Sequence, residues 1–302
     1  MRDFPSCFGE NGVEVADTLC SNTNVSKASQ NVVTSIYRCK LLGQSCFVTI
    51  TWSKNLMGQC LSFEIHDLAS FCLCKVDVKP SLFSKRKGSK CLELNRSSKI
   101  DFYWDLSLAK FGSGPEPLEG FYFAVVCKGE MVLLIGDLRK EAFKKTNATP
   151  ALSNAIFISK REHLFGKRVY GTKAQFCNKG QLHDLTILCD TVADADPCLV
   201  IHLDSKMVMQ VRRLRWKFRG NDTILVDGLP VEVFWDVHNW LHGTTLGSAV
   251  FMFQTCFSAE KLWTSQTFSD SYTSPWSCPQ SFTESKLSGL GFSLVLYAWK
   301  NE

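Results

Sequence analysis

The stretch that decides the fold is residues 208–240, VMQVRRLRWKFRGNDTILVDGLPVEVFWDVHNW. Its first half contains an alternation of basic and apolar residues. The basic residues are Arg213, Arg215, Lys217 and Arg219, and the apolar residues between them are Leu214, Trp216 and Phe218. A period of two predicts a strand with one buried face and one charged face. Turn signals follow at 220–222 and 227–230, each flanked by β-branched or aromatic residues. The stretch is therefore predicted to form a three-stranded meander.

The rest of the chain has the same rhythm. From residue 32 onward, short apolar runs recur roughly every 8–12 residues with Gly, Asn or Asp between them, which is typical of β-sandwiches and barrels. One short helix is predicted at 138–146, with Asp137 as its N-cap. No internal repeat with a fixed period is found. The predicted fold is all-β: a single large antiparallel β-sandwich or flattened barrel with one short helix.

Two segments fall outside this pattern. Residues 1–30 are polar and poor in apolar side chains, so they are predicted to be a flexible N-terminal leader to a β domain that spans 31–302. Residues 264–288 are rich in Ser and Thr and contain two prolines. That composition predicts a mobile insertion within the β domain.

Composition limits the classes of function. The chain has 302 residues, of which 45% are hydrophobic, so it can bury a large core. Its net charge of +5 is too small an excess to make nucleic acid the expected partner. Neither a signal peptide nor an apolar run long enough to span a membrane is found, and we expect a soluble intracellular protein in the cytoplasm or nucleus.

The 14 cysteines fit a reducing compartment. Most lie inside apolar strand-like runs, where a thiol behaves as a small buried hydrophobe. Cys72 and Cys74 are the only close pair, and zinc sites need a second pair with matching spacing. The sequence therefore predicts neither a metal nor another cofactor.

The basic residues are the candidate binding surface. The predicted anion face comprises two parts. One is the row Arg213, Arg215, Lys217 and Arg219, and the other is Lys85, Arg86 and Lys87 of a lysine-rich segment at 85–90 that is predicted to be a loop. The simpler interpretation is that Glu232 and Asp236 on the next strand neutralise the row, and the short sequence separation favours it. The leading hypothesis is a non-catalytic binding or scaffolding module with a protein partner. The first alternative is peripheral binding to anionic lipid through the same face.

The second alternative is an enzyme. Asp236 and His238, with Asp105 and with His202 or His242, could form an acid–base group at strand ends. Asp in the turn after a strand more often accepts backbone N–H bonds, and that interpretation is preferred. The carboxylates Asp190, Asp194, Asp196 and Asp204 could gather around calcium, although Asx turns explain them without a metal.

Several motifs resemble one known family. They are FYWDLSLAKF at 102–111, GPEP at 114–117, GFY at 120–122, EMVLL at 130–134, the block 212–240, LYAWKN at 296–301 and the leader FPSCFGE at 4–10. Together these motifs are similar to those of a plant-specific family catalogued as a domain of unknown function, number eight-six-eight. The resemblance covers nearly the full chain. It implies a plant protein with a single all-β domain, and it implies no activity.

Overall fold

The computed structural model describes residues 31–55, 58–69, 71–78, 86–95, 98–151, 155–177, 180–190, 196–242, 247–255 and 291–300. The predicted leader at 1–30 and the predicted insertion at 264–288 lie outside these residues.

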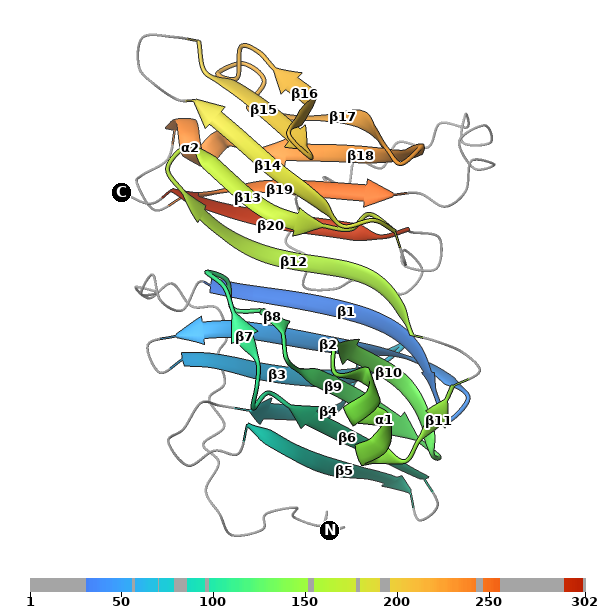
Figure 1. Ribbon diagram of the computed structural model, residues 1–302. Helices are drawn as coiled ribbons and strands as arrows, with labels where there is room; N and C mark the ends of the chain where they lie inside the picture. Colours follow the sequence, from blue (N-terminus) through green and yellow to red (C-terminus); the bar gives the residue numbers. More distant parts are fainter. Residues whose placement is uncertain are drawn as a thin grey trace, which may run out of the picture.

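One nine-stranded sheet runs through the whole described structure, in the order β17-β18-β19-β20-β12-β1-β2-β3-β4 (Figure 1). Its strands are β1 (Asn31–Leu41), β2 (Gln44–Asn55), β3 (Gly58–Asp67), β4 (Cys72–Val78), β12 (Ile156–Gly166), β17 (Arg219–Val226), β18 (Leu229–Asp236), β19 (Ser248–Thr255) and β20 (Ser293–Lys300). Most of them alternate between buried and more exposed residues, as expected for strands with one face on a core. The sheet is therefore common to both halves of the molecule.

A second sheet covers β1–β4 and completes the N-terminal lobe. Its order is β11-β10-β9-β6-β5, with β5 (Lys87–Asn95), β6 (Ser98–Asp105), β9 (Tyr122–Cys127), β10 (Glu130–Gly136) and β11 (Thr149–Pro150). A small pair, β7 (Lys110–Phe111) and β8 (Pro117–Glu119), and the helix α1 (Arg139–Thr146) complete this lobe. At the centre of its core, the ring of Phe63 contacts Phe102 and Phe123 at centroid distances of 4.8 and 4.9 Å.

A third sheet covers β17–β20 and completes the C-terminal lobe. It consists of β13 (Val169–Ala174), β14 (His183–Asp190), β15 (Cys198–Leu203) and β16 (Lys206–Val211) in that order. The short helix α2 (His238–His242) follows β18. Tyr170, Trp240 and Phe251 pack in the core of this lobe, with Tyr170 stacked on Trp240 at 4.8 Å. Each lobe therefore has its own hydrophobic core.

The two lobes have the same order of strands, although the sequence contains no repeat with a fixed period. Each consists of two four-stranded meanders, β1–β4 with β5, β6, β9 and β10, and β13–β16 with β17–β20. The clearest similarity is at one end of the first two strands in the second meander of each lobe, where a charged pair lies next to a Gly–Trp pair; we call this end the corner. In β5 and β6, Lys87 lies opposite Asp105 and Gly88 opposite Trp104. In β17 and β18, Arg219 lies opposite Asp236 and Gly220 opposite Trp235.

The predicted all-β class and most predicted strands are confirmed, and α1 is the predicted helix. Four details were wrong or missed. Strand β12 was not predicted, and it pairs antiparallel with β1 but parallel with β20, so the main sheet is mixed. Helix α2 was also not predicted. The Asp137 carboxylate does not cap α1, because it accepts the backbone N–H groups of Gly120 and Phe121 at 2.8 and 3.1 Å. The segment 220–222 is part of β17, not a turn.

Within the described residues, no helix is both long and apolar enough to cross a membrane.

Candidate functional site

The predicted cationic strand is a turn in the structure. Residues 212–218 connect β16, in the third sheet, to β17, in the nine-stranded sheet. The carbonyl of Arg213 accepts the N–H groups of Trp216 and Lys217 at 2.9 and 3.1 Å, and Arg213 itself has a φ of 57°. The chain has to cross from one sheet to the facing one here, and stacked sheets are about 10 Å apart. A straight strand through these residues cannot make that crossing.

The turn changes which side chains are exposed. Leu214 is fully buried, and its N–H donates to the carbonyl of Pro197 at 3.0 Å, so the middle of the turn is anchored to the lobe. Trp216, predicted to point into the core, is instead 85% exposed. The turn also exposes four cations, Arg212, Arg213, Arg215 and Lys217. We call residues 212–217 the basic loop.

The fourth member of the predicted row, Arg219, lies on β17 and is paired. Its Nε donates to Asp236 at 2.7 Å, and its guanidinium lies 5.6 Å from the ring centroid of Phe218. Asp236 is one of the two carboxylates expected to neutralise the row. The other, Glu232, lies opposite Thr223 further along the strand. None of the four cations of the basic loop forms an ion pair with a residue that the structure describes.

The second predicted basic element is not part of this surface. Lys85 lies outside the described residues, and residues 87–90 belong to β5 instead of a loop. Lys87 forms an ion pair with Asp105 at 2.8 Å in the N-terminal lobe. The Lys87–Asp105 pair lies in the second sheet of the N-terminal lobe, whereas the basic loop leads into β17 of the C-terminal lobe. The structure therefore does not bring the two predicted parts of the anion face together.

The candidate acid–base residues do not converge. Asp105 belongs to the N-terminal lobe, and His202 on β15 lies opposite Met207, near the end of the lobe where β16 begins. Asp236, His238 and His242 are neighbours at the other end, around Phe218. Both carboxylate oxygens of Asp236 are occupied, one by Arg219 and one by the N–H of His238 at 3.0 Å. Asp236 thus accepts a backbone N–H group in the turn after a strand, as the preferred interpretation of the sequence predicted.

The four carboxylates considered for calcium are also dispersed. Asp194 lies outside the described residues, and Asp196 is exposed beside Pro197. Asp190 ends β14, whereas Asp204 lies at the opposite end of the paired strands β14 and β15. Within the described part of the chain, no group of three or more His, Cys, Asp or Glu side chains is placed to hold a metal ion.

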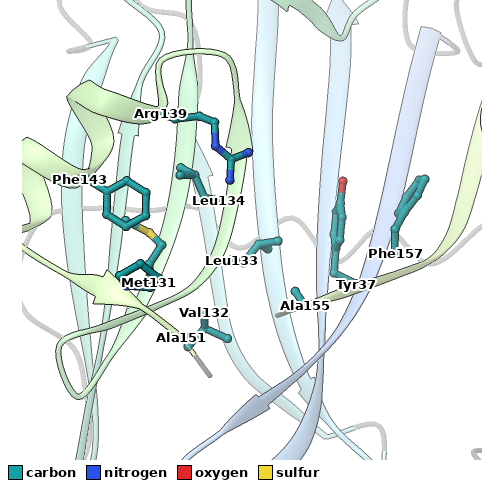
Figure 2. Close-up of a pocket in the computed structure, with 11 residues that line it drawn as sticks. Tyr37, Met131, Val132, Leu133, Leu134, Arg139, Phe143, Ala151, Ala155 and Phe157 are labelled. Atoms are coloured by element: carbon teal, nitrogen blue, oxygen red, sulfur yellow. The ribbon is translucent and has the colours of Figure 1, made fainter. Parts of the chain in front are cut away.

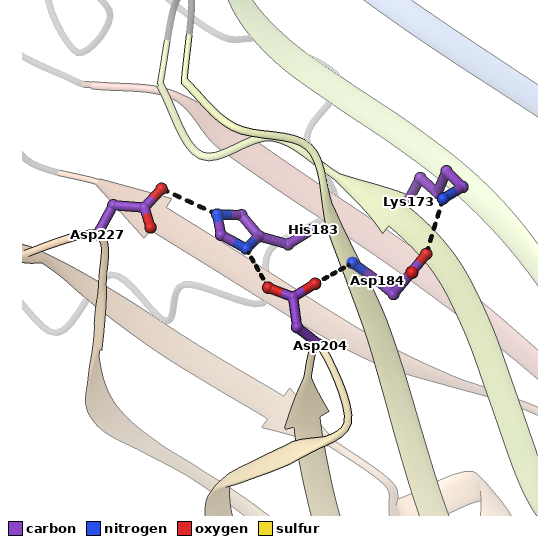
Figure 3. A network of polar contacts seen from close by, with 5 residues as sticks. All are labelled: Lys173, His183, Asp184, Asp204 and Asp227. Carbon is purple, nitrogen blue, oxygen red and sulfur yellow. Dashed lines mark hydrogen bonds and ion pairs between the residues drawn. The ribbon is translucent and has the colours of Figure 1, made fainter.

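Sequence reasoning missed a polar network around His183 (Figure 3). His183 is only 6% exposed. Its Nδ1 lies 2.6 Å from a carboxylate oxygen of Asp204, and its Nε2 lies 2.9 Å from one of Asp227. Asp204 also accepts the N–H of Asp184, whose carboxylate pairs with Lys173 at 2.9 Å. We call His183, Asp204 and Asp227 the histidine clamp.

The clamp joins two hairpins that belong to facing sheets. Asp204 lies in the turn between β15 and β16, with a φ of 49°, and Asp227 lies in the turn between β17 and β18, with a φ of 53°. Asp–Gly at 227–228 was predicted as a turn, and that prediction is confirmed. The sequence contains the two Asp residues in turns between strands. It does not indicate that both bind His183, because that contact depends on how the two sheets pack.

The electrostatics of the clamp favour a charged imidazolium. The hydrogen bond that His183 donates to Asp204, followed by the one that it donates to Asp227, raises the pKa of His183 even though burial opposes the charge. The hydrogen bond from His183 in turn lowers the pKa of Asp204. With both ring nitrogens held by carboxylates, the imidazole has no free nitrogen to accept a proton from a substrate. The clamp therefore stabilises the lobe and does not form a catalytic base.

Comparison with known proteins identifies a family. The family model described as a plant protein of unknown function, DUF868, matches residues 28–300. No curated protein and no solved structure gives a significant match. The match covers nearly all of the chain, including both lobes and the strand β12 between them. The protein therefore belongs to DUF868, the family that its motifs resemble.

Proposed function

We propose that this protein is a non-catalytic binding module that docks on anionic membrane surfaces through the basic loop. The observation that carries the proposal is the exposure of Trp216 in the middle of four exposed cations on one turn. A single exposed aromatic residue is common on protein surfaces and would not be informative alone. Its combination with Arg212, Arg213, Arg215 and Lys217 matches the chemistry of a bilayer interface.

Each part of the loop has a role in this proposal. Basic residues near an anionic bilayer contribute about 1 kcal/mol each. Tryptophan favours the headgroup region, where its apolar ring and polar N–H are both accommodated. Leu214 holds the turn in the lobe, which lowers the entropy lost when the loop binds. These properties support a membrane surface over the protein partner that was the leading hypothesis, because a protein interface commonly buries about 800 Å² on each side.

Two further observations are consistent with the proposal. Asp236, the residue central to the enzyme hypothesis, has both carboxylate oxygens engaged by Arg219 and by the backbone of His238. No disulfide joins any two of the described cysteines, as expected for a cytosolic or nuclear location. In this proposal the protein acts in that compartment, at the cytoplasmic face of a membrane.

The test is co-sedimentation with vesicles of phosphatidylcholine, with and without phosphatidylserine, over a series of salt concentrations. We expect binding only to the anionic vesicles, and we expect it to weaken as salt rises. The triple variant Arg213→Glu, Arg215→Glu, Lys217→Glu should lower partitioning by at least about 100-fold, because three contributions of about 1 kcal/mol are lost. Trp216→Ala should weaken binding without changing its dependence on salt.

The matched control changes the same number of charges elsewhere. Lys140, Lys144 and Lys145 are exposed on α1 of the N-terminal lobe, and their replacement by Glu alters net charge equally. This control should bind as the wild type does. Equal losses in the two triple variants would show that total charge, and not the basic loop, governs binding. Absence of wild-type binding to anionic vesicles would contradict docking on a membrane and would favour an acidic protein partner.

A further inference from the structure

A groove lies where β10 and α1 face β1 and β12 (Figure 2). Most of the residues that line it are apolar, while polar and apolar atoms share its exposed surface about equally. Its volume is about 300 Å³, at the lower end of the range for small-molecule sites. One side is formed by β10 and α1, which contribute Met131, Leu133 and Phe143. The other side is formed by Tyr37 of β1 and Phe157 of β12, whose rings stack at 5.0 Å.

Among the described residues, a single charged side chain lines this groove. Arg139 is the first residue of α1 and is exposed, and it forms no ion pair with any residue that the structure describes. Figure 2 shows its guanidinium and the Tyr37 hydroxyl on the upper side of the view, with Leu133 and Ala155 below them. Burial raises the pKa of Tyr37, so this hydroxyl stays neutral, and it forms a hydrogen bond with the side chain of Ser35. The groove thus has a polar side and an apolar floor.

We propose that the groove binds one amphipathic carboxylate, a single-chain fatty acid. The aliphatic chain would lie on Leu133, Ala155 and the Tyr37–Phe157 stack, where water is displaced from apolar surface. The carboxylate would pair with Arg139, whose planar guanidinium can donate two parallel hydrogen bonds. At Arg139 charge complementarity selects the anion, since the described lining contains one cation and no acidic side chain. The nearby carboxylate of Glu116, which also raises the pKa of Tyr37, is neutralised by its ion pair with Lys160 at 3.4 Å.

The site is independent of the proposed membrane surface. The groove belongs to the N-terminal lobe, whereas the basic loop belongs to the C-terminal lobe beside β17. A variant in one site therefore leaves the other intact. Binding of a monomeric fatty acid in the absence of vesicles separates the two proposals.

The experiment is calorimetric titration of the full chain with dodecanoate below its micellar concentration. We expect saturable binding of one ligand per chain. Arg139→Ala should weaken it by about 10- to 100-fold, the effect of losing a hydrogen bond to a charged group. Lys140→Ala is the matched control, because Lys140 is exposed on the same helix but does not line the groove, and it should leave affinity unchanged.

Two further arms test the apolar part and the charge. Ala155→Phe should block the groove and abolish binding, and its circular dichroism and unfolding midpoint would show whether it folds. Dodecanol, which has the same chain without the carboxylate, should bind the wild type and Arg139→Ala equally. The proposal is overturned if dodecanoate does not saturate the wild type, or if Arg139→Ala and Lys140→Ala have the same affinity.

Discussion

His183 illustrates how one buried residue can link two facing sheets. It lies at the start of β14, and the carboxylates that hold it come from two different hairpin turns. A hydrogen bond to a charged group contributes about 1.5–3 kcal/mol. Asp204 and Asp227 are about half exposed, so solvent reduces this contribution. The clamp therefore adds less to the free energy of unfolding than two such hydrogen bonds would add in a fully buried site.

The clamp makes stability depend on pH in a defined direction. Because the folded-state pKa of His183 is raised, its contribution is complete below the unfolded value of about 6.5 and declines as pH rises through the folded value. Because the pKa of Asp204 is lowered, its contribution is complete above about 3.9 and is lost as pH falls through the folded value. The clamp should therefore stabilise most between about pH 4 and 6.5.

Urea unfolding of the wild type and His183→Gln over this pH series tests the prediction. The difference in unfolding free energy should be greatest near pH 5–6 and should shrink as pH rises. His202→Gln, at a half-exposed position on the adjacent strand, is the control and should give a small difference at all pH values. A difference for His183→Gln that does not vary with pH would contradict a charged clamp.

At the scale of elements, the corner of each lobe depends on a glycine opposite a tryptophan. A Cβ atom added at Gly220 would lie 2.5 Å from Cζ2 of Trp235, and one added at Gly88 would lie 2.5 Å from Cζ2 of Trp104. Trp235 cannot easily move aside, because it is 5% exposed and its Nε1–H donates to the carbonyl of Lys217 at 2.9 Å. Trp104 is only half-buried and has more freedom to shift.

This difference predicts a graded effect. Gly220→Ala should lower the free energy of unfolding by about 1–3 kcal/mol, the usual effect of overpacking. Gly88→Ala should lower it by less. Gly114→Ala is the control and should change stability by no more than about 0.5 kcal/mol, since no atom lies within 4 Å of the added carbon. Chemical denaturation of the three variants measures the order, and equal effects at 220 and 114 would contradict the packing argument.

The whole molecule is held together by β12. This strand pairs with β1 of the N-terminal lobe and with β20 of the C-terminal lobe, so backbone hydrogen bonds continue from one lobe to the other. Its Lys160 is 14% exposed and forms ion pairs with Glu162 at 3.3 Å and with Glu116 at 3.4 Å. Glu162 also accepts a hydrogen bond from Thr172 of β13. Side chains of both lobes thus meet at the central strand.

This continuity predicts that the lobes unfold together. Phe63→Ala in the N-terminal core and Phe251→Ala in the C-terminal core should each destabilise by about 3–5 kcal/mol and lower one shared unfolding midpoint. Hydrogen exchange followed by mass spectrometry checks this, because peptides of both lobes should lose protection together in either variant. Loss of protection confined to the altered lobe would show that the lobes unfold separately.

The sequence by itself determined the all-β class, most strands and the Asp227–Gly228 turn, because alternation and turn residues are local properties. It could not determine the path of residues 212–218, since Arg–Leu–Arg–Trp–Lys–Phe–Arg satisfies a strand pattern and only the crossing between sheets requires a turn. It did not indicate β12, where Lys160 pairs with Glu162 of the same strand and also with Glu116, which is distant in sequence. The histidine clamp, the exposure of Trp216 and the groove were decided by tertiary structure, because each depends on the packing of separate elements.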